Sequence, residues 1–100
     1  MQKQQIHYWR TKQGKEIDFI VKNRAGNILT AIECKFSCSS DDGLAHNVGK
    51  NFEAFRALYP TGENLVVAHN VDRSFTRKHN DLTITFVSAQ ELVKKLKLIA

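Results

Sequence analysis

Cysteine and proline are scarce in this chain of 100 residues, which contains 2 Cys and 1 Pro. Two cysteines cannot build the disulfide framework of a small secreted domain, so a reducing, cytoplasmic location is expected. No apolar run approaches the ~20 residues that cross a bilayer, and the first residues lack the apolar stretch of a signal peptide. Secretion and membrane insertion are therefore not expected.

Acidic residues are also in deficit, with 10 Asp and Glu against 15 Lys and Arg, which gives a formal net charge of +5. An excess of positive charge favours polyanions, and nucleic acid above all, as partners. The hydrophobic share of 42% and the charged share of 25% are those of an ordinary globular protein. The composition predicts one folded domain over residues 1–100.

The hydrophobic pattern predicts the element order β-β-β-α-β-β-α, a mixed sheet with helices packed on it, classed as α/β or α+β. Strands are expected at residues 6–10, 16–22, 28–36, 64–69 and 82–87, with a polar loop at 71–81. The helix between the third and fourth strands should make their connection a right-handed parallel crossover. Its apolar stripe is Leu44, Val48, Phe52, Phe55 and Tyr59. Ser88, with Glu91 three residues on, should cap a closing helix with Leu92, Val93, Leu96 and Ile99 on its apolar side.

Acidic residues alternate with apolar ones in the second and third strands. Only one pairing parity of these strands buries both apolar sets, so the helices are expected to cover Ile17, Phe19, Val21, Ile32, Cys34 and Phe36. The opposite face would then carry Glu16, Asp18, Glu33 and Lys35. Pairing across the turn near Ala25 places Asp18 and Glu33 about 5–8 Å apart, directly or diagonally.

Carboxylates this close repel one another unless a cation lies between them, and acidic oxygens favour Mg²⁺ or Mn²⁺ over zinc. A lysine beside them can neutralise charge that develops on a substrate, so the set suits phosphodiester hydrolysis. A second interpretation stays open. The charged face can be an ordinary solvent face, with Glu16 and Lys35 forming a weak cross-strand pair.

The segments Gly14-Lys-Glu-Ile-Asp18-Phe and Ile32-Glu33-Cys-Lys35 resemble the D…(D/E)-x-K signature of the PD-(D/E)XK nuclease superfamily. Over residues 6–96, the chain most resembles the uncharacterised domain that lies C-terminal to AAA-type ATPase modules in prokaryotes. The resemblance implies a restriction-endonuclease-like fold and a Mg²⁺- or Mn²⁺-dependent nuclease, with DNA and an ATPase module of the same longer chain as partners. The sequence does not determine the oligomeric state, but superfamily nucleases that cut both strands often dimerise, so a homodimer is compatible with the resemblance.

By this resemblance, Asp18, Glu33 and Lys35 would be catalytic, and Asp18, Glu33 and the Cys34 carbonyl would bind the metal. Glu16 would have a supporting role. The superfamily core begins with a helix that has no counterpart before residue 6. The chain is therefore expected to be the C-terminal fragment of a larger ATPase-related protein. Alternatively, its metal site has one protein ligand fewer than the superfamily site. It contains no P-loop motif, so no ATP site is expected. A non-catalytic module for binding nucleic acid or protein is the alternative function.

Cysteines, histidines and basic residues elsewhere in the chain offer further candidate sites. Cys34 and Cys38 have no second Cys/His pair at zinc-binding spacing, and Cys34 is expected to be a small buried hydrophobe. The histidines, His7, His46, His69 and His79, lie on separate predicted elements and share no spacing. Arg73, Arg77 and Lys78 in the polar loop are candidates for contact with a phosphate backbone, and an ordinary solvated loop is the alternative.

Overall fold

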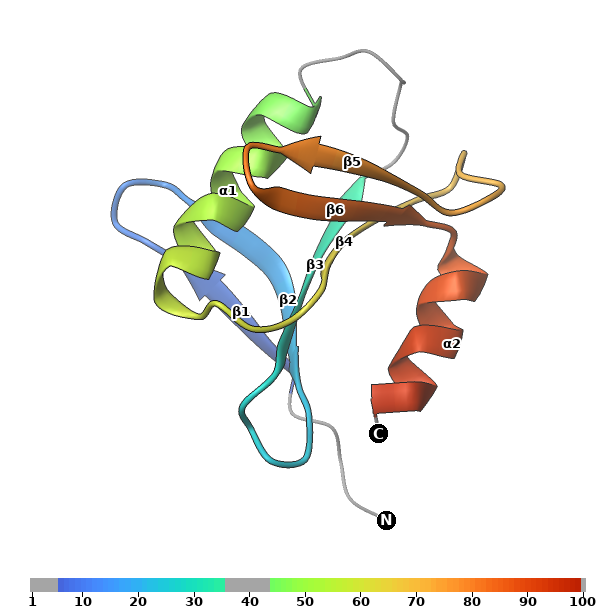
Figure 1. Ribbon diagram of the computed structural model, residues 1–100, viewed down its shortest axis with the longest axis horizontal. Coiled ribbons are helices and arrows are strands. Elements are labelled where there is room, and N and C mark those ends of the chain that lie inside the picture. Colours follow the sequence, from blue (N-terminus) through green and yellow to red (C-terminus); the bar gives the residue numbers. More distant parts are fainter. Residues whose placement is uncertain (1–5, 36–43, 100) are drawn as a thin grey trace.

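The computed structural model describes residues 6–35 and 44–99. The elements follow the order β1 (Ile6–Arg10), β2 (Glu16–Lys22), β3 (Leu29–Lys35), α1 (Leu44–Leu58), β4 (Asn64–Ala68), β5 (Phe75–His79), β6 (Leu82–Val87) and α2 (Ala89–Ile99). All six strands form one mixed sheet in the order β1-β2-β3-β4-β6-β5 (Figure 1). The predicted mixed sheet with two helices is confirmed.

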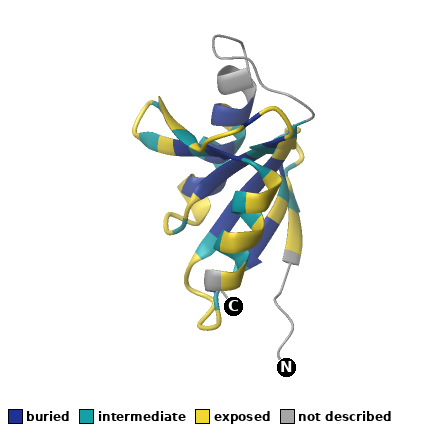
Figure 2. Cartoon of the chain, turned by 90° about the vertical axis from the view of Figure 1, so that its right-hand side faces the viewer, coloured by how far each residue is buried: buried dark blue, intermediate teal, exposed yellow. Residues whose placement is uncertain are grey.

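The two helices cover opposite faces of this sheet, so the fold has three layers. On one face, α1 packs against a core that includes Ile20, Ala31 and Val66. On the other face, Leu92 and Leu96 of α2 pack against the neighbouring strand residues Val21, Ile32 and Leu65. Strand residues alternate between the two cores because successive side chains of a strand point to opposite faces. Figure 2 shows α2 in front of the buried central strands, with its outer side exposed.

The connection from β3 through α1 to β4 is parallel, as predicted, with Ile32 beside Leu65 and Cys34 beside Val67. In α1, the predicted stripe is buried at Val48, Phe52 and Phe55. Tyr59 follows the end of the helix and its residue surface is 42% exposed. In α2, the Glu91 N–H donates to Ser88 Oγ at 3.2 Å, which confirms the predicted cap. Neither described helix is long and apolar enough to cross a membrane.

The polar loop predicted at 71–81 was wrong, because this segment contains β5. Asn80 and Asp81 form the turn between His79 and Leu82, and Asn80 takes the positive φ of 53° that asparagine tolerates. Phe75 stacks on Phe86 of β6, with ring centroids 4.7 Å apart. The hairpin follows from this turn and from the burial of Phe75. Phe36, Cys38 and the helix caps sought between residues 37 and 43 lie outside the described residues.

The Arg56 side chain of α1 donates hydrogen bonds to five acceptors. Its surface is only 7% exposed, and it donates to the carbonyls of Leu29 and Glu63 at 2.8 and 2.7 Å. It also donates to the carbonyls of Tyr59 and Thr61 and to Asn64 Oδ1, at 3.0, 3.2 and 2.7 Å. Burial lowers the pKa of Arg56 to about 10, so the group stays charged at neutral pH. The guanidinium thus joins the end of α1 to the beginnings of β3 and β4.

Replacing Arg56 with lysine should lower the free energy of unfolding by about 2–4 kcal/mol. Lysine keeps the charge but lacks the planar fork that satisfies these acceptors, so buried carbonyls lose their donors. Urea unfolding followed by circular dichroism measures the change. Arg24→Lys, at an exposed position of the β2–β3 turn, is the matched control and should change stability by less than about 0.5 kcal/mol. Equal stability of the two variants would contradict this role.

Candidate functional site

Asp18 and Glu33 meet where the regular pairing of β2 and β3 ends, at Phe19 beside Ile32. Beyond that pair, carboxylates replace backbone carbonyls as hydrogen-bond acceptors. The Asp18 N–H donates to Glu33 Oε1 at 3.1 Å, and the Cys34 N–H donates to Asp18 Oδ2 at 2.8 Å. Each carboxylate therefore binds the backbone of the opposite strand. The predicted closeness of Asp18 and Glu33 is confirmed.

An irregularity in β2 places Asp18 at this position. His7 and Trp9 of β1 are separated by Tyr8 alone, whereas their partners Ile20 and Ile17 are separated by two residues, Asp18 and Phe19. Two residues opposite one define a β-bulge, which re-aims side chains and interrupts the alternation of faces.

The bulge overturns part of the predicted face pattern. Ile17 lies in the α1-side core and Val21 in the α2-side core, while Phe19 is 45% exposed. These three residues were expected to share one buried face. That expectation was wrong because the bulge shifts the alternation and because both faces of the sheet are covered.

Glu33 is buried, with only 4% of its surface exposed. Burial, and then the negative charge of Asp18, raise its pKa to about 7, against the opposing effects of the Asp18 N–H and of Lys35. Within the described part of the chain, no ion pair joins Asp18 or Glu33 to a cation. Among the described residues, the two carboxylates therefore lie together without an ion-pair partner.

Cys34 departs from its prediction, because its side chain is exposed rather than part of the core. Glu33 takes the α1-facing position that follows Ala31 in the alternation, and Cys34 turns to the other face near the end of β3. Partial burial of the sulfur and the charges of Asp18 and Glu33 raise the pKa of the Cys34 thiol. A raised pKa disfavours the thiolate, which is the reactive form of a cysteine.

Glu16 is held by β1 rather than by Lys35. The Tyr8 hydroxyl donates to Glu16 Oε2 at 2.7 Å, and Arg10 Nε lies 3.9 Å from the same oxygen. The bond to Glu16 raises the pKa of Tyr8. The alternative cross-strand pair of Glu16 with Lys35 is therefore replaced by a pair with Arg10. Of the charged groups that affect Glu33, Glu16 has the smallest effect.

The donor set for a metal is small. Among residues 6–35 and 44–99, no three His, Cys, Asp or Glu side chains are grouped to hold an ion. Mg²⁺ keeps several waters and is commonly bound by one or two protein carboxylates, so Asp18 and Glu33 fit this ion better than zinc. The N–H and C=O of one strand residue point to the same side, so the Cys34 carbonyl is directed toward β2, as its N–H is.

The basic residues predicted to contact nucleic acid lie on or next to an edge strand. Arg77 and Lys78 belong to β5, Arg73 precedes it, and all three are exposed. The Arg77 guanidinium lies over the Phe75 ring, 5.2 Å from its centroid. Three strand spacings separate β5 from β3, which is about 14 Å. Phe75 shares a row across the sheet with Phe86, Val66 and Glu33.

A polar cluster between α1 and the β5–β6 turn was not predicted from the sequence. Glu53 contacts His79 Nε2 at 3.1 Å and accepts a hydrogen bond from Asn80 Nδ2 at 2.5 Å. These hydrogen bonds lower the pKa of Glu53. Gly49 allows the close approach, because a Cβ there would collide with the His79 ring. The only available signal was the Gly49–Glu53 spacing, which puts both residues on one side of a helix.

A scan against protein-family models matches the chain over residues 1–92 to a domain of unknown function, DUF4143. The chain belongs to the DUF4143 family. No curated protein matches it. The residues that match the DUF4143 model include all the described strands and the candidate site. The family description assigns no chemistry to that site.

Metal-free wild-type protein should lose stability as the pH rises from about 4.5 to about 7, relative to Glu33→Gln. In this window the unfolded chain releases the Glu33 proton while the folded chain keeps it, because the folded pKa is about 7 and the ordinary value is 4.5. The difference between the two proteins should grow by at most about 3 kcal/mol and level off above pH 7. Urea unfolding in EDTA at several pH values measures it.

Glu63→Gln, at an exposed position, is the control: the difference in stability between wild type and this variant should change little over the same pH range. A difference between wild type and Glu33→Gln that stays constant from pH 4.5 to 8 would contradict the raised pKa.

Proposed function

We propose that this domain is a PD-(D/E)XK-type nuclease that uses Mg²⁺ or Mn²⁺ to hydrolyse phosphodiesters of nucleic acid. One observation carries the proposal: the buried carboxylate of Glu33 lies against Asp18, no ion pair to either is found among the described residues, and Lys35 follows two residues later. Such a pair raises the free energy of the metal-free fold. A cation bound between the carboxylates would offset that cost.

Each residue has a role that follows from its position. Asp18 and Glu33 would hold the metal, with the Cys34 carbonyl as a further ligand. A metal bound there would supply a nucleophilic hydroxide and polarise the phosphate. Lys35, half-buried at the end of β3, would place its ammonium near the phosphate oxygens and stabilise their developing charge. Glu16, bound by Tyr8, would act only as a supporting charge.

The wider context of this proposal rests on the resemblance alone. It comprises an AAA-type ATPase module in the same longer chain, a homodimer, and DNA rather than RNA as substrate. The proposed cytoplasmic location rests instead on the scarcity of cysteine. The net charge of +5 supports a polyanionic substrate independently of the resemblance.

A second candidate is a non-catalytic module that binds nucleic acid or protein. The favouring observation is that Asp18 and Glu33 already serve the fold as acceptors for the Cys34 and Asp18 N–H groups. In this case the carboxylates would close the end of the β2–β3 pair, and the basic edge at β5 would be the binding surface. Metal binding distinguishes the two candidates.

Calorimetric titration of the chain with Mn²⁺ should show saturable binding that Asp18→Asn abolishes. Asparagine can still accept the Cys34 N–H, so the fold should survive while the charge is lost. At a hundred times the dissociation constant, Mn²⁺ should raise the free energy of unfolding of the wild type by about 2.7 kcal/mol.

Glu16→Gln is the matched control, because it removes a nearby carboxylate that the proposal does not assign to the metal. It should retain binding. Wild-type protein that binds no Mn²⁺ at millimolar concentration would exclude the nuclease and leave the non-catalytic module. Bound metal without cleavage of single-stranded or duplex DNA would locate the failure in catalysis rather than in the carboxylate pair.

Arg77→Gln and Lys78→Gln should each weaken binding of duplex DNA in EDTA. A side chain that neutralises one phosphate contributes about 0.9 to the slope of log affinity against log salt, so each variant should reduce the slope by about that amount. Fluorescence anisotropy between 50 and 200 mM NaCl measures it. Lys97→Gln on α2 is the control. Unchanged slopes for both β5 variants would show that the basic edge does not contact DNA.

A further inference from the structure

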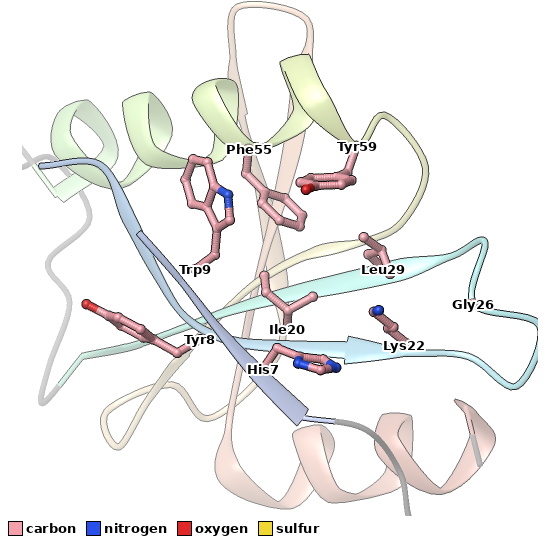
Figure 3. Close-up of a pocket in the computed structure, with 9 residues that line it drawn as sticks. All are labelled: His7, Tyr8, Trp9, Ile20, Lys22, Gly26, Leu29, Phe55 and Tyr59. Carbon is pink, nitrogen blue, oxygen red and sulfur yellow. The ribbon is translucent and has the colours of Figure 1, made fainter. Parts of the chain in front are cut away.

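A hollow of about 280 Å³ opens on the α1 side of the sheet, between β1, the β2–β3 hairpin and the end of α1 (Figure 3). Aromatic side chains form one wall: the ring centroids of Trp9 and Phe55 are 5.2 Å apart, and those of Phe55 and Tyr59 are 5.0 Å apart. Ile20 and Leu29 line the opposite side. A concave apolar surface with few polar groups is the usual form of a small-ligand site.

Lys22 contributes an ammonium to this hollow, which the imidazole of His7 also lines. Figure 3 shows its ammonium directed into the space below Tyr59 and Leu29. No Asp or Glu lines the hollow, and no ion pair is found for Lys22 among the described residues. An ammonium that faces an apolar wall without a carboxylate is complementary to an anion that carries an apolar group.

We propose that this hollow binds a small organic monoanion, in which one aromatic ring or branched aliphatic group carries a carboxylate. The apolar group would pack against Trp9 and Tyr59, and the carboxylate would pair with Lys22. The volume is slightly below the ~300–1,000 Å³ of pockets for drug-sized ligands, so it suits one such group. The ligand can be a free carboxylic acid or the C-terminal residue of a polypeptide, which present the same chemistry.

The surroundings favour a carboxylate over a phosphate. The hollow lies at the C-terminal end of α1, where the helix dipole carries partial negative charge. This charge repels a phosphate dianion more strongly than a carboxylate monoanion. The described lining of the hollow contains the Lys22 ammonium and the His7 imidazole, but no arginine and no helix N-terminus to bind a second negative charge. Lys22 also lies four residues from Asp18 along β2, about 13 Å away. The site is therefore separate from the carboxylate pair of the proposed nuclease.

Trp9 is the chain's only tryptophan, so its fluorescence reports on this hollow directly. Titration with 3-phenylpropionate in EDTA should shift the emission, with a dissociation constant on the order of 0.1–1 mM. The neutral 3-phenylpropanol should bind about threefold to tenfold more weakly, because it lacks the ion pair, and 3-phenylpropylamine should bind more weakly still. Equal binding of the alcohol or the amine would overturn the proposal.

Lys22→Met should weaken 3-phenylpropionate binding about threefold to tenfold and leave the binding of the alcohol unchanged. The alcohol thus tests whether the variant is folded. Lys97→Met, on the opposite side of the sheet, is the matched control and should bind like the wild type. A Lys22→Met variant that binds the acid as tightly as the wild type does would contradict the proposal.

Three further probes identify the source of the ligand. A dipeptide ending in phenylalanine is compared with its C-terminal amide: preference for the free acid, at an affinity at least that of 3-phenylpropionate, supports a polypeptide C-terminus. Binding of 3-phenylpropionate without binding of the dipeptide supports a free carboxylic acid as the ligand. Tighter binding of deoxyadenosine monophosphate would overturn the proposal in favour of a nucleotide. Because EDTA is present throughout, none of these outcomes depends on the metal site.

Discussion

The fold depends on Arg56, a buried cation that forms no ion pair with a carboxylate in the described part of the chain. Arg56 satisfies carbonyls at the beginnings of β3 and β4, and Asn64, which it binds, donates in turn to the Thr83 carbonyl beside β6. These contacts lie where the three parallel strands begin, and the acidic pair lies at their other end. Gly62 serves the same junction, because its φ of 145° and the closeness of the Leu29 carbonyl leave no room for a Cβ. The cation thus fixes the strand alignment that places Glu33.

Coverage of both sheet faces explains why the candidate site is buried and charged. In a sheet with one solvated face, the alternation in β3 would put Glu33 in water, where its pKa would be ordinary. Here both faces are packed, so a polar side chain in either alternating set lowers the free energy of unfolding. Glu33 remains where an apolar residue would stabilise the fold, and such an exchange is typical of functional sites.

The sequence predicted local features well and the far-reaching contacts poorly. Turn residues and apolar alternation gave the β2–β3 hairpin and the closeness of Asp18 to Glu33, because both depend on near neighbours. The bulge at Asp18 and Phe19 was missed, since its cause lies in the pairing with Tyr8. The role of Arg56 could not be predicted from the sequence, because its partners are mostly backbone carbonyls, which any residue provides. Strand β5 carried a signal, the Asn80–Asp81 turn, that the basic composition of the segment obscured.

The two hydrogen bonds between the carboxylates and the backbone serve both proposed functions. They satisfy N–H groups where the β2–β3 ladder ends, and they fix one oxygen of each carboxylate. Fixed carboxylates lose little freedom when a cation binds, which favours binding. The same rigidity prevents the charges of Asp18 and Glu33 from moving apart, so the proton that Glu33 retains near neutral pH substitutes for the cation. A metal that binds there must displace this proton, and its affinity would rise with pH through the pKa of Glu33.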